Sequence, residues 1–251
     1  MKKKTNKLST RQIVVIGILG AITVVLGMTP LGFVPIGPLN ATTMHIPVLI
    51  AAFIEGPVVG AFVGLIFGLS SLFNAITRPT PISFVFYNPL ISIAPRILLG
   101  LIAYGLFAAF KRIDGKRLKI LGMAAWVAVI GFLVVGVVKN VAADTFGAGF
   151  ALNVAFLLLS FGLLYLLARS EAKSAAVVLA SFLATVIHSA MVMSGIYIFF
   201  AEDFVRAMGA PQTLVNTVIF GTIITSGVPE GILAGIVATG VVTAWTASKN
   251  K

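Results

Sequence analysis

Long apolar runs dominate the chain and restrict what it can fold into. Hydrophobic residues make up 59% of the sequence and charged residues only 10%, whereas a soluble domain carries roughly 25% charged residues. The runs approach the ~20 residues with which a helix crosses a bilayer. Alternating strands of about ten residues, which are typical of membrane barrels, are absent. The composition therefore predicts an all-α protein, a polytopic bundle of transmembrane helices.

Eight helical segments can be drawn, within a single integral membrane domain that covers 1–251. The second segment is short for a span, and the last is interrupted at Gly227-Val228-Pro229. The first has a basic start but no Ala-x-Ala-like cleavage site, so we expect a retained helix rather than a signal peptide. The segments lie near residues 12–28, 44–55, 57–76, 88–110, 119–139, 150–168, 174–200 and 214–247.

The basic residues predict the orientation of the chain. Its net charge is +11, which we attribute to the enrichment of Lys and Arg in cytoplasmic loops rather than to nucleic-acid binding. With both termini in the cytoplasm, fourteen of the eighteen basic residues lie inside: Lys2, Lys3, Lys4, Lys7, Arg11, Lys111, Arg112, Lys116, Arg117, Lys119, Arg169, Lys173, Lys249 and Lys251. This asymmetry supports an even number of spans but leaves six and eight both open.

Polar and aromatic residues gather in the expected outer loops, at 29–43, 77–87 and 201–213. Elaborate outer loops over a helix bundle suggest that something is captured from outside. The motifs of several enzyme classes are absent: there is no Walker sequence, no HExxH, no Gly-x-Ser-x-Gly and no cysteine. We therefore expect a binding protein without a metal site or cofactor, rather than an enzyme.

Small residues mark expected contacts between helices, because only they let helix backbones approach closely in lipid. The third segment carries Gly56, Gly60, Gly64 and Gly68, which predicts packing on a neighbouring helix of the same chain. The first segment carries Gly17 and Ala21. That pair is equally compatible with internal packing and with docking of another membrane protein.

Arg96 is the costliest residue in the apolar segments, at about 2.5–3.5 kcal/mol on insertion scales. It could reach the outer headgroups, but Pro89 and Pro95 imply irregular backbone around it and favour a cavity. There its guanidinium would await an anionic ligand such as a carboxylate.

Other polar residues in or near the outer half are candidates for the same site. Glu230 is more simply explained by ion pairing with Arg96 or by accepting from free amides than by binding substrate. His188 is either a packing residue or a functional one. Thr43 could cap the second helix. Together with Arg96, the candidate substrate-binding residues are Asn40, Thr42, Thr43, His45, Tyr87, Asn88, His188 and Glu230.

Three stretches carry a resemblance to a known family: TPLGFVPIGPLNATTMHIPVLIAAFIEGPVVGAFVGLIFGLSSL, PTPISFVFYNPLISIAPRILLGL and GVPEGILAGIV. They resemble the substrate-binding (S) components of energy-coupling factor vitamin transporters, and the first loop looks most like the pantothenate-type branch. The resemblance implies a six-helix core with an outward-facing vitamin pocket. It also implies a transmembrane coupling (T) subunit and two cytoplasmic ATPases as partners, in the cell membrane of a prokaryote. Gly17 and Ala21 would contact the coupling subunit, with glycine in place of the family's first alanine.

The chain departs from this family at about 113–173, where two further apolar segments look inserted into a core of 10–112 and 174–247. The leading interpretation is a membrane-embedded subunit that captures a small water-soluble vitamin, with pantothenate favoured, for ATP-driven uptake. The alternative is a self-sufficient transporter of a small organic anion, coupled to protons through His188 and Glu230.

Overall fold

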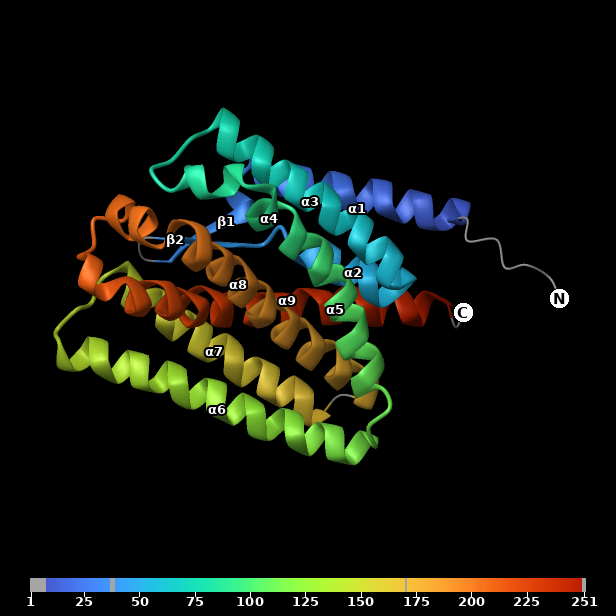
Figure 1. The fold of residues 1–251 in the computed structure, drawn as a ribbon. Helices are drawn as coiled ribbons and strands as arrows, with labels where there is room; N and C mark the ends of the chain where they lie inside the picture. The colour runs from blue at the N-terminus through green and yellow to red at the C-terminus, as the bar shows by residue number, and fades with distance from the viewer. Residues whose placement is uncertain (1–7, 37–38, 170, 250–251) are drawn as a thin grey trace.

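The chain forms a bundle of long helices with a short β-hairpin at one end (Figure 1). The computed structural model describes residues 8–36, 39–169 and 171–249, with 33–36 and 39–41 described by their backbone alone. Its elements are α1 (Thr10–Met28), η1 (Pro30–Gly32), β1 (Phe33–Ile36), β2 (Leu39–Thr42), α2 (Ile46–Glu55), α3 (Pro57–Thr77), η2 (Ser83–Tyr87), α4 (Pro89–Ser92), α5 (Ala94–Phe110), α6 (Gly115–Ala142), α7 (Ala148–Arg169), α8 (Ala172–Ala207), η3 (Gln212–Leu214) and α9 (Val215–Lys249).

All eight expected helical segments are present, and the prediction of a helical membrane bundle is confirmed. Within the described residues, seven helical segments are long and apolar enough to cross a bilayer. The exception is α2, whose ten residues reach only about 15 Å, half the thickness of a hydrocarbon core. Since its residues 46–53 are all buried, α2 is an interior helix.

Helix α2 is too short to cross a bilayer by itself, and the antiparallel β1–β2 hairpin provides the remaining length of the crossing. The hairpin lies among the helices at the end of the bundle away from the termini, and β2 leads into α2 (Figure 1). Glu55, at the far end of α2, forms an ion pair with Arg11 at the start of α1. Strand β2 and helix α2 together therefore run back along the whole length of α1.

Both described ends of the chain lie at the same end of the bundle (Figure 1). The guanidinium of Arg11 lies 5.2 Å from the ring centre of Trp245, close to the end of α9. Nearby, Lys173 Nζ at the start of α8 donates to Thr246 Oγ1 at 3.2 Å. An even number of crossings requires this arrangement. That this end faces the cytoplasm remains the prediction made from the basic residues.

The expected interruption at Gly227-Val228-Pro229 is wrong, because α9 continues through Pro229. Proline removes one helical hydrogen bond, but membrane helices tolerate this loss when neighbouring helices hold them in place. Helix α8 provides that support: a Cβ atom on Gly227 would lie 3.3 Å from Ser189 Oγ. Gly231, one turn later, packs on Phe182 of α8.

The glycine repeat on α3 packs against α5, as the sequence predicted. A Cβ atom on Gly60 would lie 3.2 Å from the Cα of Gly100, and one on Gly68 would lie 2.7 Å from the Cα of Ile93. Gly64 meets the backbone of Arg96 in the same way. Gly56 has a different role, because its φ of 98° allows the tight turn between α2 and α3.

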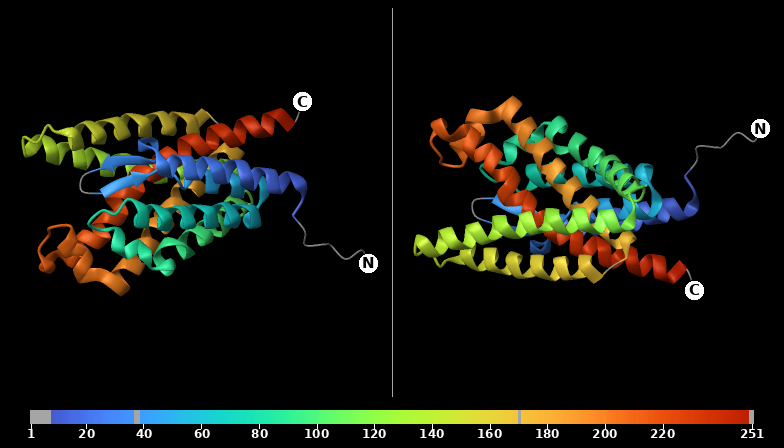
Figure 2. Two further views of the ribbon diagram at one scale, coloured as in Figure 1. Left: turned by 90° about the horizontal axis from the view of Figure 1, so that it is seen from above. Right: turned by 90° about the horizontal axis from the view of Figure 1, so that it is seen from below.

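Helices α6 and α7 form an antiparallel pair along one side of the bundle (Figure 2). Trp126 fastens α6 to its neighbours: its Nε1 donates to the carbonyl of Ser160 on α7 at 3.0 Å, and its ring packs edge-on against Phe182 of α8. The start of α6 lies beside the start of α8, which follows the pair in the chain: a Cβ atom on Gly115 would lie 2.8 Å from the Cβ of Ala172.

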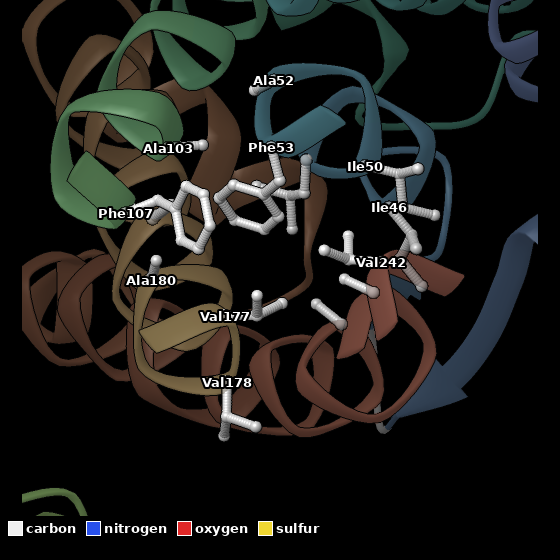
Figure 3. Packing of buried hydrophobic residues seen from close by; sticks show 14 of the residues in the cluster. Ile46, Ile50, Ala52, Phe53, Ala103, Phe107, Val177, Val178, Ala180 and Val242 are labelled. Atoms are coloured by element: carbon white, nitrogen blue, oxygen red, sulfur yellow. The ribbon is translucent and has the colours of Figure 1, made fainter. Parts of the chain in front are cut away.

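The half of the bundle nearer the termini is filled by apolar side chains. Figure 3 shows Phe53 of α2 beside Phe107 of α5, with ring centres 5.0 Å apart, above Val177 of α8. In the same view, Val242 of α9 lies next to Ile46 of α2. The cavities described below are lined by residues toward the other end, around the β-hairpin.

Candidate functional site

A break between two helices places Arg96 inside the bundle. Helix α4 ends at Ser92, Ile93 leaves regular helical geometry, and α5 begins with Pro95 in its first turn. This confirms the irregular backbone expected from the prolines. The Nη1 of Arg96 donates to the carbonyl of Ile91, a group freed by the break.

Arg96 is almost completely enclosed, with 5% of its surface exposed. Its guanidinium lies 5.3 Å from the ring centre of Phe67 and 5.5 Å from that of Phe86, both within the range of cation–π attraction. Its Nε has no hydrogen-bond partner among the described residues. No described carboxylate lies within ion-pair distance of it. The guanidinium therefore lies within the protein rather than on its lipid-facing surface.

Two cavities meet at Arg96. The larger has a volume of about 460 Å³ and lies where α1 ends and α3 ends, and Asn74 and Arg78 line it. The smaller, of about 110 Å³, lies toward α8 and α9, where His188 and Glu230 line it. Four residues line both cavities: Thr42, Ile82, Phe86 and Arg96. We call these two spaces the large and the small compartment.

Glu230 connects α9 to the β-hairpin. Its Oε1 accepts the backbone N–H of Thr42 at 2.7 Å, and its Oε2 accepts Ser189 Oγ at 3.5 Å. The expected ion pair with Arg96 is not formed between these residues. The other role expected for Glu230, accepting from free backbone amides, is closer to what is found. The carboxylate does accept an amide, but the amide is that of Thr42 at the end of strand β2 and not one at the start of a helix.

Replacing Glu230 with methionine is expected to release the end of β2. The side chain keeps its length but loses the acceptor, and a hydrogen bond to a charged group contributes about 1.5–3 kcal/mol. Amide hydrogen exchange at Thr42 should accelerate by at least about tenfold. The control is Ser189→Ala, which removes only the 3.5 Å contact and should change this rate little. Unchanged protection of Thr42 in Glu230→Met would contradict the assignment.

The two histidines lie together, but only one reaches a cavity. His188 lines the small compartment, is 5% exposed, and neither of its ring nitrogens has a hydrogen-bond partner among the described residues. His45 is fully buried against it, with ring centres 6.5 Å apart and nearly parallel planes, and lines neither compartment. Phe67 flanks His188 on another side, at 6.0 Å.

The remaining candidates are placed less centrally. Tyr87 is 47% exposed and lines neither compartment, and Asn88 uses its side chain to cap α4 by accepting from Leu90 N–H at 3.0 Å. Thr43 does not cap α2: its hydroxyl donates to the carbonyl of Leu31, and His45 occupies the cap position without a side-chain bond. Asn40 lies in β2, and its side chain falls outside the described part of the structure.

Sequence reasoning did not single out several residues that line the compartments, including Ile82, Phe86 and Arg78. Arg78 falls within the expected outer loop at 77–87. One signal was available for it: a cation directly after a long apolar helix, on the side opposite most basic residues. Nothing in the pattern distinguished Phe86 from the chain's other phenylalanines, because its position depends on how η2 packs on α3 and α4.

Gly17 and Ala21 lie on an open face of α1. Both are exposed, and a Cβ atom on Gly17 would meet nothing within 4 Å. Internal packing within the described chain therefore does not explain the small residue at position 17. The neighbouring side chains on this face are large and apolar, namely Ile13, Val14, Ile18, Ile22 and Val25.

The fold and the cavities define a class: a multi-pass membrane protein with a buried arginine where two cavities meet. Residues 11–143, more than half of the sequence, match the family model described as "ECF transporter, substrate-specific component", and the chain belongs to this family. This is a family of transporter components and not of enzymes, and the seven apolar helical segments agree with a multi-pass protein of the plasma membrane. The match runs through α6, into the region that we expected to be inserted.

Two curated bacterial relatives show partial similarity. The pantothenate transporter PanT of Leuconostoc mesenteroides is 38% identical over 99 residues, which cover 39% of this chain and 48% of that protein. The pantothenic acid transporter PanT of Lactococcus lactis subsp. cremoris is 37% identical over 81 residues, which cover 27% of this chain and 41% of that protein. The chain thus spans less than half the length of these two relatives.

Proposed function

We propose that this chain captures pantothenate from outside the cell and presents it for ATP-driven uptake. The single observation that carries the proposal is Arg96, a buried guanidinium at the meeting point of two cavities, with no described carboxylate within ion-pair distance. Burying a charge is costly unless it is paired. The carboxylate of the ligand would supply the missing partner. The names of the two curated relatives support the choice of pantothenate.

The other groups at the compartments suit the rest of such a molecule. Pantothenate carries two hydroxyl groups and an amide besides its carboxylate. We propose that His188 and Glu230 hydrogen-bond with these groups and that Thr42 closes the site through the β-hairpin. The total volume of the two compartments falls within the ~300–1,000 Å³ typical of small-molecule sites. Asn40, Thr43, His45, Tyr87 and Asn88 would support the site from its surroundings.

A panel of vitamins tests this function. Pantothenate is expected to raise the unfolding temperature of the purified chain, while biotin, thiamine and riboflavin leave it unchanged, because a ligand stabilises the state that binds it. Mass spectrometry of ligand that co-purifies with the protein provides an independent measurement. If none of the vitamins shifts the unfolding temperature, vitamin capture is wrong. Pantothenate uptake by liposomes that hold only this chain would favour a self-sufficient transporter instead.

We propose that the exposed face around Gly17 and Ala21 docks a transmembrane coupling subunit, which acts with two cytoplasmic ATPases. The space above Gly17 lets another helix approach closely, which is how helices associate in lipid. Replacing both residues with leucine is expected to leave pantothenate binding unchanged and to reduce uptake by the assembled transporter at least about tenfold.

The docking prediction has a matched control at Gly131 of α6, which is also exposed with open space above it. Gly131→Leu should leave uptake unchanged. Equal losses of uptake from both replacements would mean that bulk on any lipid-facing helix is harmful, and would rule out a specific docking face.

We also propose that the α6–α7 pair, within residues 113–173, is an addition to a core formed by 10–112 and 174–247. The close approach of Gly115 and Ala172 supports this division, because an insertion must leave and rejoin the core at nearby points.

A further inference from the structure

The two compartments differ in charge. Among the described residues that line the large compartment are two arginines, Arg78 and Arg96, and no aspartate or glutamate. Those that line the small compartment include Glu230 and His188 together with the shared Arg96. A ligand whose ends differ in chemistry therefore meets different surroundings in its two possible orientations.

Arg78 supplies the second cation of the large compartment. It ends α3, and its Nη1 donates to the carbonyl of Met28 at 3.1 Å. Beside it, Asn74 Nδ2 donates to the carbonyl of Gly27 at 2.9 Å. These two bonds hold the outer ends of α1 and α3 together along the rim of the compartment. A guanidinium has five N–H donors, so Arg78 keeps donors free for an anion while it holds α1.

The small compartment offers hydrogen-bond acceptors and apolar walls. Each oxygen of Glu230 accepts one protein donor, and a carboxylate oxygen has room for a second. A neutral imidazole also has one accepting nitrogen, and His188 uses neither nitrogen within the described chain. Hydroxyl groups can donate to both residues. A carboxylate here would instead face the charge of Glu230 in a poorly screened interior.

We infer that the ligand lies across the junction in one orientation: its carboxylate in the large compartment between Arg96 and Arg78, its hydroxylated end in the small one. The inference rests on the proposed function and assigns the substrate class as an elongated acid with alcohol groups at the far end. In pantothenate, the two hydroxyls would donate to His188 and Glu230. The geminal methyl groups would contact the apolar wall formed by Val192 and Ile196.

The test compares three ligands on the full-length chain by titration calorimetry. Pantothenate has both ends, pantothenol replaces the carboxylate with an alcohol, and N-(3,3-dimethylbutanoyl)-β-alanine lacks both hydroxyls. Arg78→Gln should weaken pantothenate about fivefold, less so in high salt, and leave pantothenol unchanged. His188→Phe should weaken pantothenate and pantothenol about tenfold and leave the hydroxyl-free acid unchanged.

Matched controls separate these effects from general damage. Arg206 is an exposed arginine that pairs with Asp203 and lines neither compartment, so Arg206→Gln should alter no affinity. For His188→Phe the hydroxyl-free acid is itself the control, because general damage to the site would weaken all three ligands. The inference is overturned if Arg78→Gln weakens pantothenate and pantothenol equally, or weakens neither. It is also overturned if His188→Phe acts on all three ligands alike. Absence of pantothenate binding to the unmodified chain would overturn the proposed function itself.

Discussion

Replacing Arg96 with glutamine is expected to weaken pantothenate binding about a hundredfold, because the charge-assisted bonds to the carboxylate are lost in a water-poor site. At a ligand concentration 100 times the original Kd, the stabilisation by ligand would fall from about 2.7 kcal/mol to about 0.4 kcal/mol. Thermal unfolding with and without pantothenate measures this difference.

The same substitution should not destabilise the ligand-free protein. Arg96 is buried, its Nε has no partner, and no described carboxylate lies within ion-pair distance of it; an unpaired buried charge costs free energy. Without ligand, the unfolding temperature of Arg96→Gln is therefore expected to equal or exceed that of the original chain. This pattern, lower affinity without lower stability, distinguishes a binding residue from a structural one.

Arg112→Gln is the matched control, since Arg112 is exposed and follows α5 at the opposite end of that helix. It should change neither stability nor affinity. If Arg96→Gln is folded and retains the full ligand-dependent shift, Arg96 does not hold the carboxylate, and the main support for the proposed function is lost.

Replacing Gly64 with alanine is expected to destabilise the protein by about 3 kcal/mol, at the upper end of what overpacking costs. The added methyl group would collide with the carbonyl oxygen of Arg96 and come within 2.8 Å of the carbonyl carbon. These are backbone atoms, which cannot move aside like the end of a flexible side chain. Helices α3 and α5 would have to separate, and the segment that carries Arg96 would move with α5.

Unfolding temperature and pantothenate affinity should therefore both fall in Gly64→Ala. The control is Gly105→Ala on α5, where the added methyl group meets nothing within 4 Å. That change should be neutral or stabilising by up to about 1 kcal/mol, because alanine favours helix over glycine. Equal stability of Gly64→Ala and the original chain would show that the α3–α5 contact is looser than described.

The sequence predicted the helices well because the bilayer demands long apolar segments, and such segments are visible without knowledge of their partners. It also predicted the contact made by Gly60, Gly64 and Gly68, since close approach in lipid requires small residues at regular spacing. The broken backbone before Arg96 followed from two prolines. The structure confirms all three expectations.

Features that depend on distant contacts were missed or wrongly described. The β-hairpin was expected to be only a polar outer loop, and its strands are visible only once β1 and β2 pair. Pro229 was expected to break its helix, but α8 holds α9 continuous. Of the two roles expected for Glu230, the ion pair with Arg96 is not formed; the carboxylate accepts an amide, but that of Thr42 in a strand, which is 188 positions away along the chain.

The sequence by itself determined that this chain is a helical membrane protein with a cation too costly to leave in lipid. Each of those properties follows from the transfer free energy of individual side chains, which needs no neighbours to evaluate. The tertiary structure decided that Arg96 points into the protein and that two compartments meet at it. It also decided that Arg78, and not Tyr87, lines the large compartment together with Arg96. Those outcomes depend on which helices pack together and how closely, and packing is a property of pairs of distant segments.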